Sequence, residues 1–148
     1  MKQLLGSLAL VAVALFGSGV APNALAEQGA AKGKGKYQIV FHVAENTPQH
    51  WQIALNNAMA FQRNVGKDNS QVEIVANGPG LNMLKLESQV AGRVAQALDL
   101  NIDVVACGET MTTTKVTKDD LIGGVRVVPG GIIEIADKQR AGWVYIRP

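Results

Sequence analysis

The chain has 148 residues, of which 47% are hydrophobic and 18% are charged, and its net charge is +2. A chain of this length and apolar content can bury an ordinary core, which predicts a single domain. The nearly balanced charge gives no electrostatic basis for binding nucleic acid or an anionic membrane surface, so we expect neither as a partner.

The amino-terminal segment has the layout of a secretory signal peptide. Lys2 precedes an uncharged apolar run, residues 4–16, which is shorter than the roughly 20 residues needed to span a membrane. Residues 24–26, Ala-Leu-Ala, have the small-x-small pattern of a signal-peptidase site. We therefore expect a Sec-type signal peptide over residues 1–26, cut after Ala26, and a periplasmic or secreted protein with no membrane attachment after cleavage. An uncleaved anchor is the less favoured alternative.

The segment after the expected cut, residues 27–36, reads "EQGAAKGKGK". It is rich in Gly, Ala and Lys and has no side chains to bury, which predicts a flexible leader. Its Gly-Lys alternation lacks the preceding strand and the following Ser or Thr of a phosphate-binding loop. The single folded domain is therefore expected over residues 37–148.

The first part of the domain alternates between strand and helix patterns. Residues 37–44 are rich in β-branched and aromatic side chains and predict a strand. Thr47 is a suitable N-cap and Pro48 fits the first helical position, so a helix should begin there and end at Gly66. Residues 71–76 predict the second strand.

The middle of the domain continues the same alternation. Ser88 is a candidate cap for a second helix, and residues 102–107 form an apolar run that predicts the third strand. The run "TTTK", residues 112–115, is interpreted as a solvated loop. Residues 117–120, Thr-Lys-Asp-Asp, have the form of a capping box with Asp in place of Glu, which predicts a short helix.

The last part of the chain predicts a strand over residues 125–128, a helix over residues 132–140 and a final strand over residues 143–146. Alternation of this kind is typical of parallel sheets with helices on both faces. The sequence therefore predicts a three-layer α/β/α domain with a mainly parallel five-stranded sheet and flavodoxin-like layering.

In an open parallel sheet, ligands bind beyond the carboxyl ends of the strands. The loops expected at that edge supply our candidate pocket residues. The Gly-Pro-Gly segment is interpreted as a turn at the pocket edge, because it lacks the third glycine of a dinucleotide-binding loop. The candidates are Asn46, Gly78, Pro79, Gly80, Met83, Gly108, Glu109 and Met111.

Cys107 is the only cysteine of the chain and the candidate catalytic residue. It ends a predicted strand, and Gly108 then allows a sharp turn into a helical turn. Unpaired backbone N–H groups at such a place favour the thiolate, which is the nucleophilic form, although the neighbouring Glu109 acts in the opposite direction. Alternatively, Cys107 is a small buried apolar residue or pairs with another chain.

Other chemistry has little support in the sequence. A histidine could activate the thiol, but His42 within a strand is better interpreted as a hydrogen-bonded sheet residue and His50 as a surface residue. Metal ligands would need to recur at set spacing, which two histidines and one cysteine do not provide. We expect neither a metal ion nor an organic cofactor.

The segments "NGPGLNMLKLES", "ACGETM" and "GWVYIRP" resemble the DsrE/DsrF-like family, small α/β proteins tied to sulfur oxidation and sulfur relay. The resemblance covers residues 37–148. It implies a persulfide carried on Cys107, sulfur donor and acceptor proteins, and a homo-oligomer, either a trimer or a hexamer. The known carriers are cytoplasmic members of multi-subunit complexes, whereas this chain is expected to carry an export signal.

Three hypotheses follow for function. In the first, this is a periplasmic persulfide carrier of sulfurtransferase type that passes sulfur from Cys107 to a thiol acceptor; whether it turns over as an enzyme is left open. In the second, it is a non-catalytic oligomeric module that binds a small ligand or a protein, and Cys107 is structural. In the third, Cys107 pairs between subunits as a redox sensor.

Overall fold

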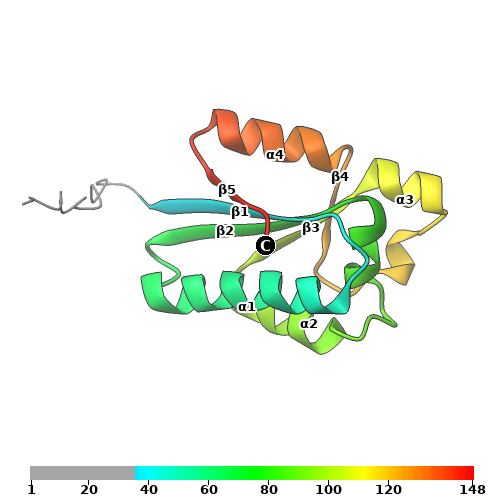
Figure 1. Cartoon of the computed structure of the whole chain (residues 1–148), viewed down its shortest axis with the longest axis horizontal. Coiled ribbons are helices and arrows are strands. Elements are labelled where there is room, and N and C mark those ends of the chain that lie inside the picture. The colour runs from blue at the N-terminus through cyan, green and yellow to red at the C-terminus, as the bar shows by residue number, and fades with distance from the viewer. Residues whose placement is uncertain (1–35) are drawn as a thin grey trace, which may run out of the picture. The chain divides into compact units, whose positions relative to one another are not determined.

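The computed structural model describes residues 36–148 (Figure 1). The predicted signal peptide and all but the last residue of the predicted leader lie outside the described residues. Within the described part, no helix is both long enough and apolar enough to cross a membrane.

The domain contains one sheet of five strands, all parallel, in the order β4-β3-β2-β1-β5. This confirms the predicted fold class. The elements in chain order are β1 (Tyr37–Val43), α1 (Pro48–Val65), β2 (Ser70–Ala76), the 3₁₀ helix η1 (Gly78–Leu84), α2 (Ala91–Asp99), β3 (Asp103–Cys107), α3 (Gly108–Thr114), the 3₁₀ helix η2 (Lys118–Asp120), β4 (Arg126–Val128), α4 (Gly131–Arg140) and β5 (Val144–Ile146).

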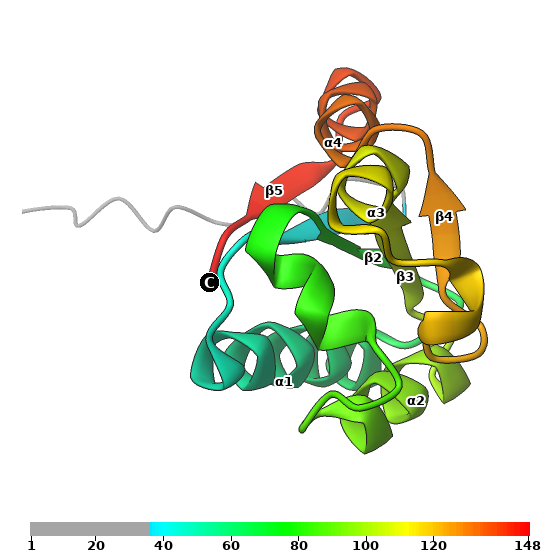
Figure 2. The same ribbon diagram turned by 90° about the vertical axis from the view of Figure 1, so that its right-hand side faces the viewer.

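Helices cover both faces of the sheet. Helices α1 and α2 lie on one face and α4 lies on the other (Figure 1). Helix α3 and η1 are neighbours at the carboxyl ends of the strands (Figure 2). Since all five strands run in the same direction, the loops that follow β1 to β4 gather at this edge.

The core is divided between the two faces. The larger cluster packs α1, α2 and η1 against the sheet and includes Phe41, Leu55 and Ile74. Each such side chain contributes roughly 1.5–3 kcal/mol on burial. The smaller cluster lies under α4 and consists of Val40, Val75, Val105, Val128 and Ile135.

Helix α1 begins and ends where the sequence predicts. Thr47 occupies the N-cap position without a side-chain capping hydrogen bond, Pro48 is the first residue, and Gly66 follows the last residue with φ of 88°. Proline at the first position loses no helical hydrogen bond, and glycine adopts positive φ without strain. The buried Trp51 donates its indole N–H to the carbonyl oxygen of Glu45 at 2.7 Å, which ties the loop after β1 to the helix.

The prediction of a loop at residues 112–115 is wrong for the three threonines, which are helical and extend α3 to Thr114. Their hydroxyls donate to carbonyl oxygens four residues earlier; Thr112, for example, bonds to the carbonyl of Gly108 at 3.0 Å. Back-bonding of this kind satisfies the hydroxyls within the helix, so their polarity does not require a loop.

Two further boundaries differ from the sequence prediction by more than one residue. Helix α2 begins at Ala91, not directly after Ser88, and the Ser88 hydroxyl accepts a hydrogen bond from the N–H of Val90 at 3.4 Å in the preceding turn. The segment predicted as a Gly-Pro-Gly turn continues as η1 to Leu84. Its buried side chains, including Leu81, anchor it in the larger core, and this tertiary burial is absent from the local sequence signal.

Gly80 allows η1 to pack on the end of β1. A Cβ at this position would overlap with the carbonyl oxygen of Val43, a backbone atom that cannot be displaced cheaply. The backbone N–H of Gly80 donates to the carbonyl of Ala44 at 3.1 Å. Close backbone approach therefore requires glycine here.

We expect Gly80→Ala to lower the free energy of unfolding by at least about 2 kcal/mol, because the added methyl group overlaps with backbone. Gly92→Ala is the matched control. Gly92 is exposed in α2 with no atom within 4 Å of the added Cβ, so alanine should stabilise by about 0.5 kcal/mol. Urea unfolding of both variants measures the difference; equal effects would contradict this account of Gly80.

Candidate functional site

Cys107 is the last residue of β3 and the N-cap of α3, so strand and helix follow each other without a linker. Its side chain is 4% exposed. Gly108 makes the direct transition possible, since a Cβ there would lie 2.9 Å from the carbonyl oxygen of Val128 on the neighbouring strand. The thiol is thus held at the carboxyl edge of the sheet, between β2 and β4.

The first residue of α4 contacts the thiol. The backbone N–H of Gly131 donates to Sγ of Cys107 at 3.2 Å. A Cβ at Gly131 would lie 3.1 Å from Cβ of Cys107 and 3.3 Å from Cβ of Asn77, so a larger residue would push the helix away. Glycine therefore brings the N-terminus of α4, with its partial positive charge, directly onto the sulfur atom.

The surroundings of Cys107 favour the thiolate. Burial raises the pKa of the thiol, but the Thr110 hydroxyl and the neighbouring backbone N–H groups, of which that of Gly131 bonds to Sγ at 3.2 Å, together hold the pKa below its ordinary value. Donors to the charged form lower an acid's pKa in this way. A lowered pKa increases the fraction of the nucleophilic form at neutral pH.

Thr110 connects the thiol to a pocket. Its Oγ1 accepts a hydrogen bond from the N–H of Gly78 at 2.9 Å, which leaves its own O–H free to donate to the sulfur. The pocket has a volume of about 550 Å³ and opens between η1 and α3, the neighbours seen in Figure 2. It is lined by Gly78, Pro79, Leu81, Asn82, Glu109, Thr110, Thr113 and Thr114.

The structure separates the predicted pocket residues into four groups. Gly78, Pro79 and Glu109 line the 550 Å³ pocket, and Gly108 lies beside the thiol against β4. Asn46 accepts a hydrogen bond from Asn82 at 3.2 Å and lines a separate pocket of about 310 Å³. The remaining candidates are buried beside or within the larger core: Gly80, Met83 and Met111.

His42 belongs to a hydrogen-bonded chain next to the site. It is 8% exposed, its Nδ1 bonds to the hydroxyl of Tyr145 at 2.7 Å, and its Nε2 bonds to Oδ1 of Asn77 at 2.8 Å. An amide oxygen only accepts, so Nε2 carries the proton. Both ring nitrogens are thus satisfied, as interpreted from the sequence, while His50 lies exposed on α1.

Sequence reasoning missed Thr110, Asn77 and Gly131. Thr110 carried a usable signal, because it lies three residues after the thiol, within reach of the first helical turn. Gly131 belongs to the loop of residues 129–131, which the sequence placed at the same edge of the sheet, whereas Asn77 carried no signal. The proximity of both residues to Cys107 arises only when β2, β3 and α4 pack together.

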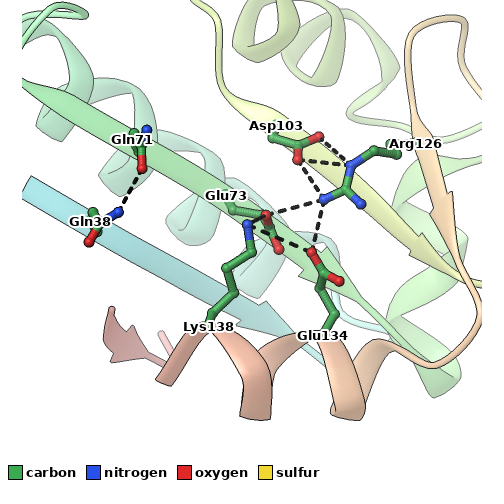
Figure 3. A network of polar contacts seen from close by, with 7 residues as sticks. All are labelled: Gln38, Gln71, Glu73, Asp103, Arg126, Glu134 and Lys138. Carbon is green, nitrogen blue, oxygen red and sulfur yellow. Dashed lines mark hydrogen bonds and ion pairs between the residues drawn. The ribbon is translucent and has the colours of Figure 1, made fainter. Parts of the chain in front are cut away.

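A second polar cluster lies on the same face of the sheet, beneath α4 (Figure 3). Glu73 of β2 is fully buried and bonds to Lys138 Nζ at 2.6 Å and to Arg126 Nη2 at 3.3 Å. The same Arg126 nitrogen lies 2.6 Å from Asp103 and 3.0 Å from Glu134. Sequence analysis singled out none of these residues, although a glutamate in the middle of an apolar strand was a visible anomaly.

These acidic side chains do not make a metal site. Across residues 36–148, no three His, Cys, Asp or Glu side chains come together as a group that could hold a metal ion. The cations of Arg126 and Lys138 occupy the positions between the carboxylates of the cluster.

The chain matches the model of the DsrE/DsrF-like family over residues 35–148. It is similar to the structure of a protein of unknown function, MTH1491, from Methanobacterium thermoautotrophicum, with 30% identity and a TM-score of 0.72 over 76% of this chain and 100% of that chain. It is also similar in fold to the ychN protein from E. coli, with 16% identity and a TM-score of 0.62 over 75% of this chain and 99% of that one. No curated protein matches the chain.

We expect Thr110→Val to raise the pKa of the Cys107 thiol, because valine keeps the shape of threonine but cannot donate to sulfur. Thr113→Val is the matched control, since Thr113 lies one turn further along α3 and bonds to the carbonyl of Glu109. The pH dependence of thiolate absorbance measures both pKa values. The same shift in both variants would refute the role of the Thr110 hydroxyl.

Proposed function

Because this chain belongs to the DsrE/DsrF-like family, whose members are associated with sulfur relay, we propose that it is a periplasmic sulfur-handling protein that carries a persulfide on Cys107 and passes sulfur to a thiol acceptor. The observation that carries the proposal is the environment of the sulfur atom. Sγ accepts a hydrogen bond from the backbone N–H of Gly131 at 3.2 Å, and Thr110 helps to lower the pKa of the thiol.

The transfer consists of two thiol exchange steps. The Cys107 thiolate attacks the outer sulfur of a donor persulfide, R–S–SH, so that a new S–S bond forms at Sγ, the donor S–S bond breaks and the donor leaves as the thiolate R–S⁻. An acceptor thiolate then attacks the outer sulfur of the Cys107 persulfide and regenerates the Cys107 thiolate. Both steps balance without an added oxidant, reductant, metal ion or cofactor.

The hydrogen bonds around Sγ serve both steps. In the first they stabilise the attacking thiolate, and in the second they stabilise the same thiolate as the leaving group. The N–H of Gly131 is fixed by α4 and the Thr110 hydroxyl is fixed by the N–H of Gly78. Donors fixed in this way need no reorganisation when charge develops on sulfur.

Partner binding belongs to the same proposal. Three exposed apolar side chains, Val127, Ile132 and Ile133, lie in β4 and α4, the elements that adjoin Cys107 at Gly108 and Gly131. Apolar side chains in such a position suit contact with a sulfur donor, a sulfur acceptor or another copy of the chain. A homo-oligomer, trimeric or hexameric, rests on the family resemblance.

The second candidate function is a non-catalytic binding module. Two observations favour it: the side chain of Cys107 is only 4% exposed, and a 550 Å³ pocket opens beside it between η1 and α3. In this alternative Cys107 packs as a small apolar residue, and the pocket holds a small molecule or a peptide segment.

We expect the protein, expressed with its amino-terminal segment and recovered from the periplasm, to gain one sulfur atom when it is exposed to a persulfide donor. Intact mass spectrometry measures the gain. The added sulfur should disappear on reduction and should be absent in Cys107→Ser, because the chain has one cysteine.

The same experiment separates the candidate functions. An unmodified mass, together with a thiol that reacts with iodoacetamide only after denaturation, would reject persulfide carriage and favour the binding module. Recovery of the protein solely from the cytoplasm, with residues 1–26 still attached, would reject the periplasmic location.

A further inference from the structure

Helix α4 joins the thiol site to the buried charged cluster. Its first residue, Gly131, donates to Sγ of Cys107, and two later residues, Glu134 and Lys138, hold the cluster around Glu73 (Figure 3). The two features are therefore covered by one helix of ten residues. A movement of α4 away from the sheet would expose Glu73 to water and uncover Cys107 at the same time.

The cluster is not balanced in charge when Glu73 is ionised. Three carboxylates, those of Glu73, Asp103 and Glu134, then face two cations, Arg126 and Lys138. Glu73 Oε1 is buried and has no hydrogen-bond partner within the described residues. A buried carboxylate that is only partly satisfied carries a desolvation cost that its ion pair does not fully repay.

When Glu73 is protonated, the remaining charges form two balanced pairs. Arg126 bonds to Asp103 at 2.6 Å, and Lys138 lies 3.7 Å from Glu134 on the same helix. Lys138 Nζ also lies 4.1 Å from the centre of the Trp143 ring, a favourable cation–π distance. The protonated cluster keeps the contact of Arg126 with Glu134 of α4 at 3.0 Å, and the Lys138–Glu73 ion pair becomes a hydrogen bond from a cation to a neutral carboxyl. The excess negative charge is lost.

We propose that α4 is a gate over Cys107 and that a proton on Glu73 holds the gate closed. With Glu73 protonated, α4 stays seated and the thiol stays covered. With Glu73 ionised, α4 opens more often, so the thiol becomes accessible. A role for this gate in sulfur transfer rests on the function proposed above. The opening and closing of α4 itself does not require that function.

Linkage gives the direction of the pH effect. Burial raises the pKa of Glu73 to about 7 from its ordinary value of 4.5; the hydrogen bond and charge of Lys138 oppose this rise, and the charges of Glu134 and Asp103 add to it. Opening restores the ordinary pKa, so the seated state binds more protons between pH 4.5 and about 7. The added stability of the seated state is complete below pH 4.5 and is lost as pH rises through about 7.

The size of the effect has an upper bound. Each pKa unit between the seated and the open state is a factor of ten in the opening equilibrium, so this difference permits at most a ~300-fold rise in opening. A partial opening that leaves Glu73 incompletely hydrated gives a smaller rise in the opening equilibrium. We expect at least a tenfold rise, roughly one pKa unit of coupling.

Other ionisable groups face the two features. Those around Glu73 are Lys138 and Glu134 from α4, Asp103 from β3 and Arg126 from β4, with Lys67 in the adjoining pocket. Those close to Cys107 are Glu109, in α3, and His42, which bonds to Asn77 beside the thiol. A test of the gate must therefore separate Glu73 from His42.

The test measures access to Cys107 as a function of pH. Because the chain has one cysteine, its rate of alkylation by iodoacetamide reports Cys107 alone. The thiolate fraction is obtained separately from thiolate absorbance, and the ratio of rate to thiolate fraction measures opening. We expect this ratio to rise at least tenfold from about pH 5 to about pH 8 in the unmodified protein.

Two variants assign the effect to Glu73, and His42→Gln serves as the histidine control. Glu73→Gln copies the protonated carboxyl, so the ratio should stay flat at its low-pH value. Asp137→Asn removes an exposed carboxylate from the same helix and should behave like the unmodified protein. Hydrogen exchange of the α4 amides should follow the same pattern, with protection that falls with rising pH unless Glu73 is replaced by Gln.

Several outcomes would overturn the gate. If the ratio of alkylation rate to thiolate fraction rose equally with pH in Glu73→Gln, Glu73 would not control the gate. If the rise of this ratio with pH persisted in Glu73→Gln but disappeared in His42→Gln, the pH effect would belong to His42. Alkylation needs no sulfur donor, so the gate remains measurable if Cys107 takes up no sulfur, and sulfur uptake at constant pH remains measurable if the gate fails.

Discussion

The close approach of α4 to the ends of β2 and β3 is the contact on which the site depends. It is possible because residue 131 has no side chain: a Cβ would meet Cys107 at 3.1 Å and Asn77 at 3.3 Å. With glycine there, the first N–H of the helix lies 3.2 Å from the sulfur atom. Without this approach, Cys107 would lose one of the hydrogen bonds that lower its pKa and the helix that covers it.

The face of the sheet under α4 is organised in rows, because side chains of a strand alternate between faces. The register places Val40 beside Glu73 and Asp103, places His42 beside Val75, Val105 and Arg126, and pairs Cys107 with Val128 at the carboxyl ends. Helix α4 crosses these rows, because its Gly131 contacts Cys107 and its Lys138 contacts Glu73. The seating of one helix therefore links a buried charge to a buried thiol.

Much of the fold was predictable because its signals are local. The caps of α1 at Thr47 and Gly66 and the alternation of strand and helix are properties of short segments. The helical threonines of α3 and the length of η1 were not predictable, because back-bonded hydroxyls and the burial of Leu81 stabilise them, and the local sequence pattern shows neither. Cys107 was identified from its position at the end of a predicted strand. Thr110 and Gly131 were not identified as hydrogen-bond donors to its sulfur atom.

The sequence by itself determined the α/β alternation, the single thiol and its place at the end of a strand, since these depend on local patterning and on chain direction. Only the tertiary structure decided which groups surround that thiol and that Glu73 has two cations within reach. The reason is physical: Gly131 and Cys107 are 24 residues apart and Arg126 and Glu73 are 53 residues apart, so their contacts form only when the sheet and α4 assemble.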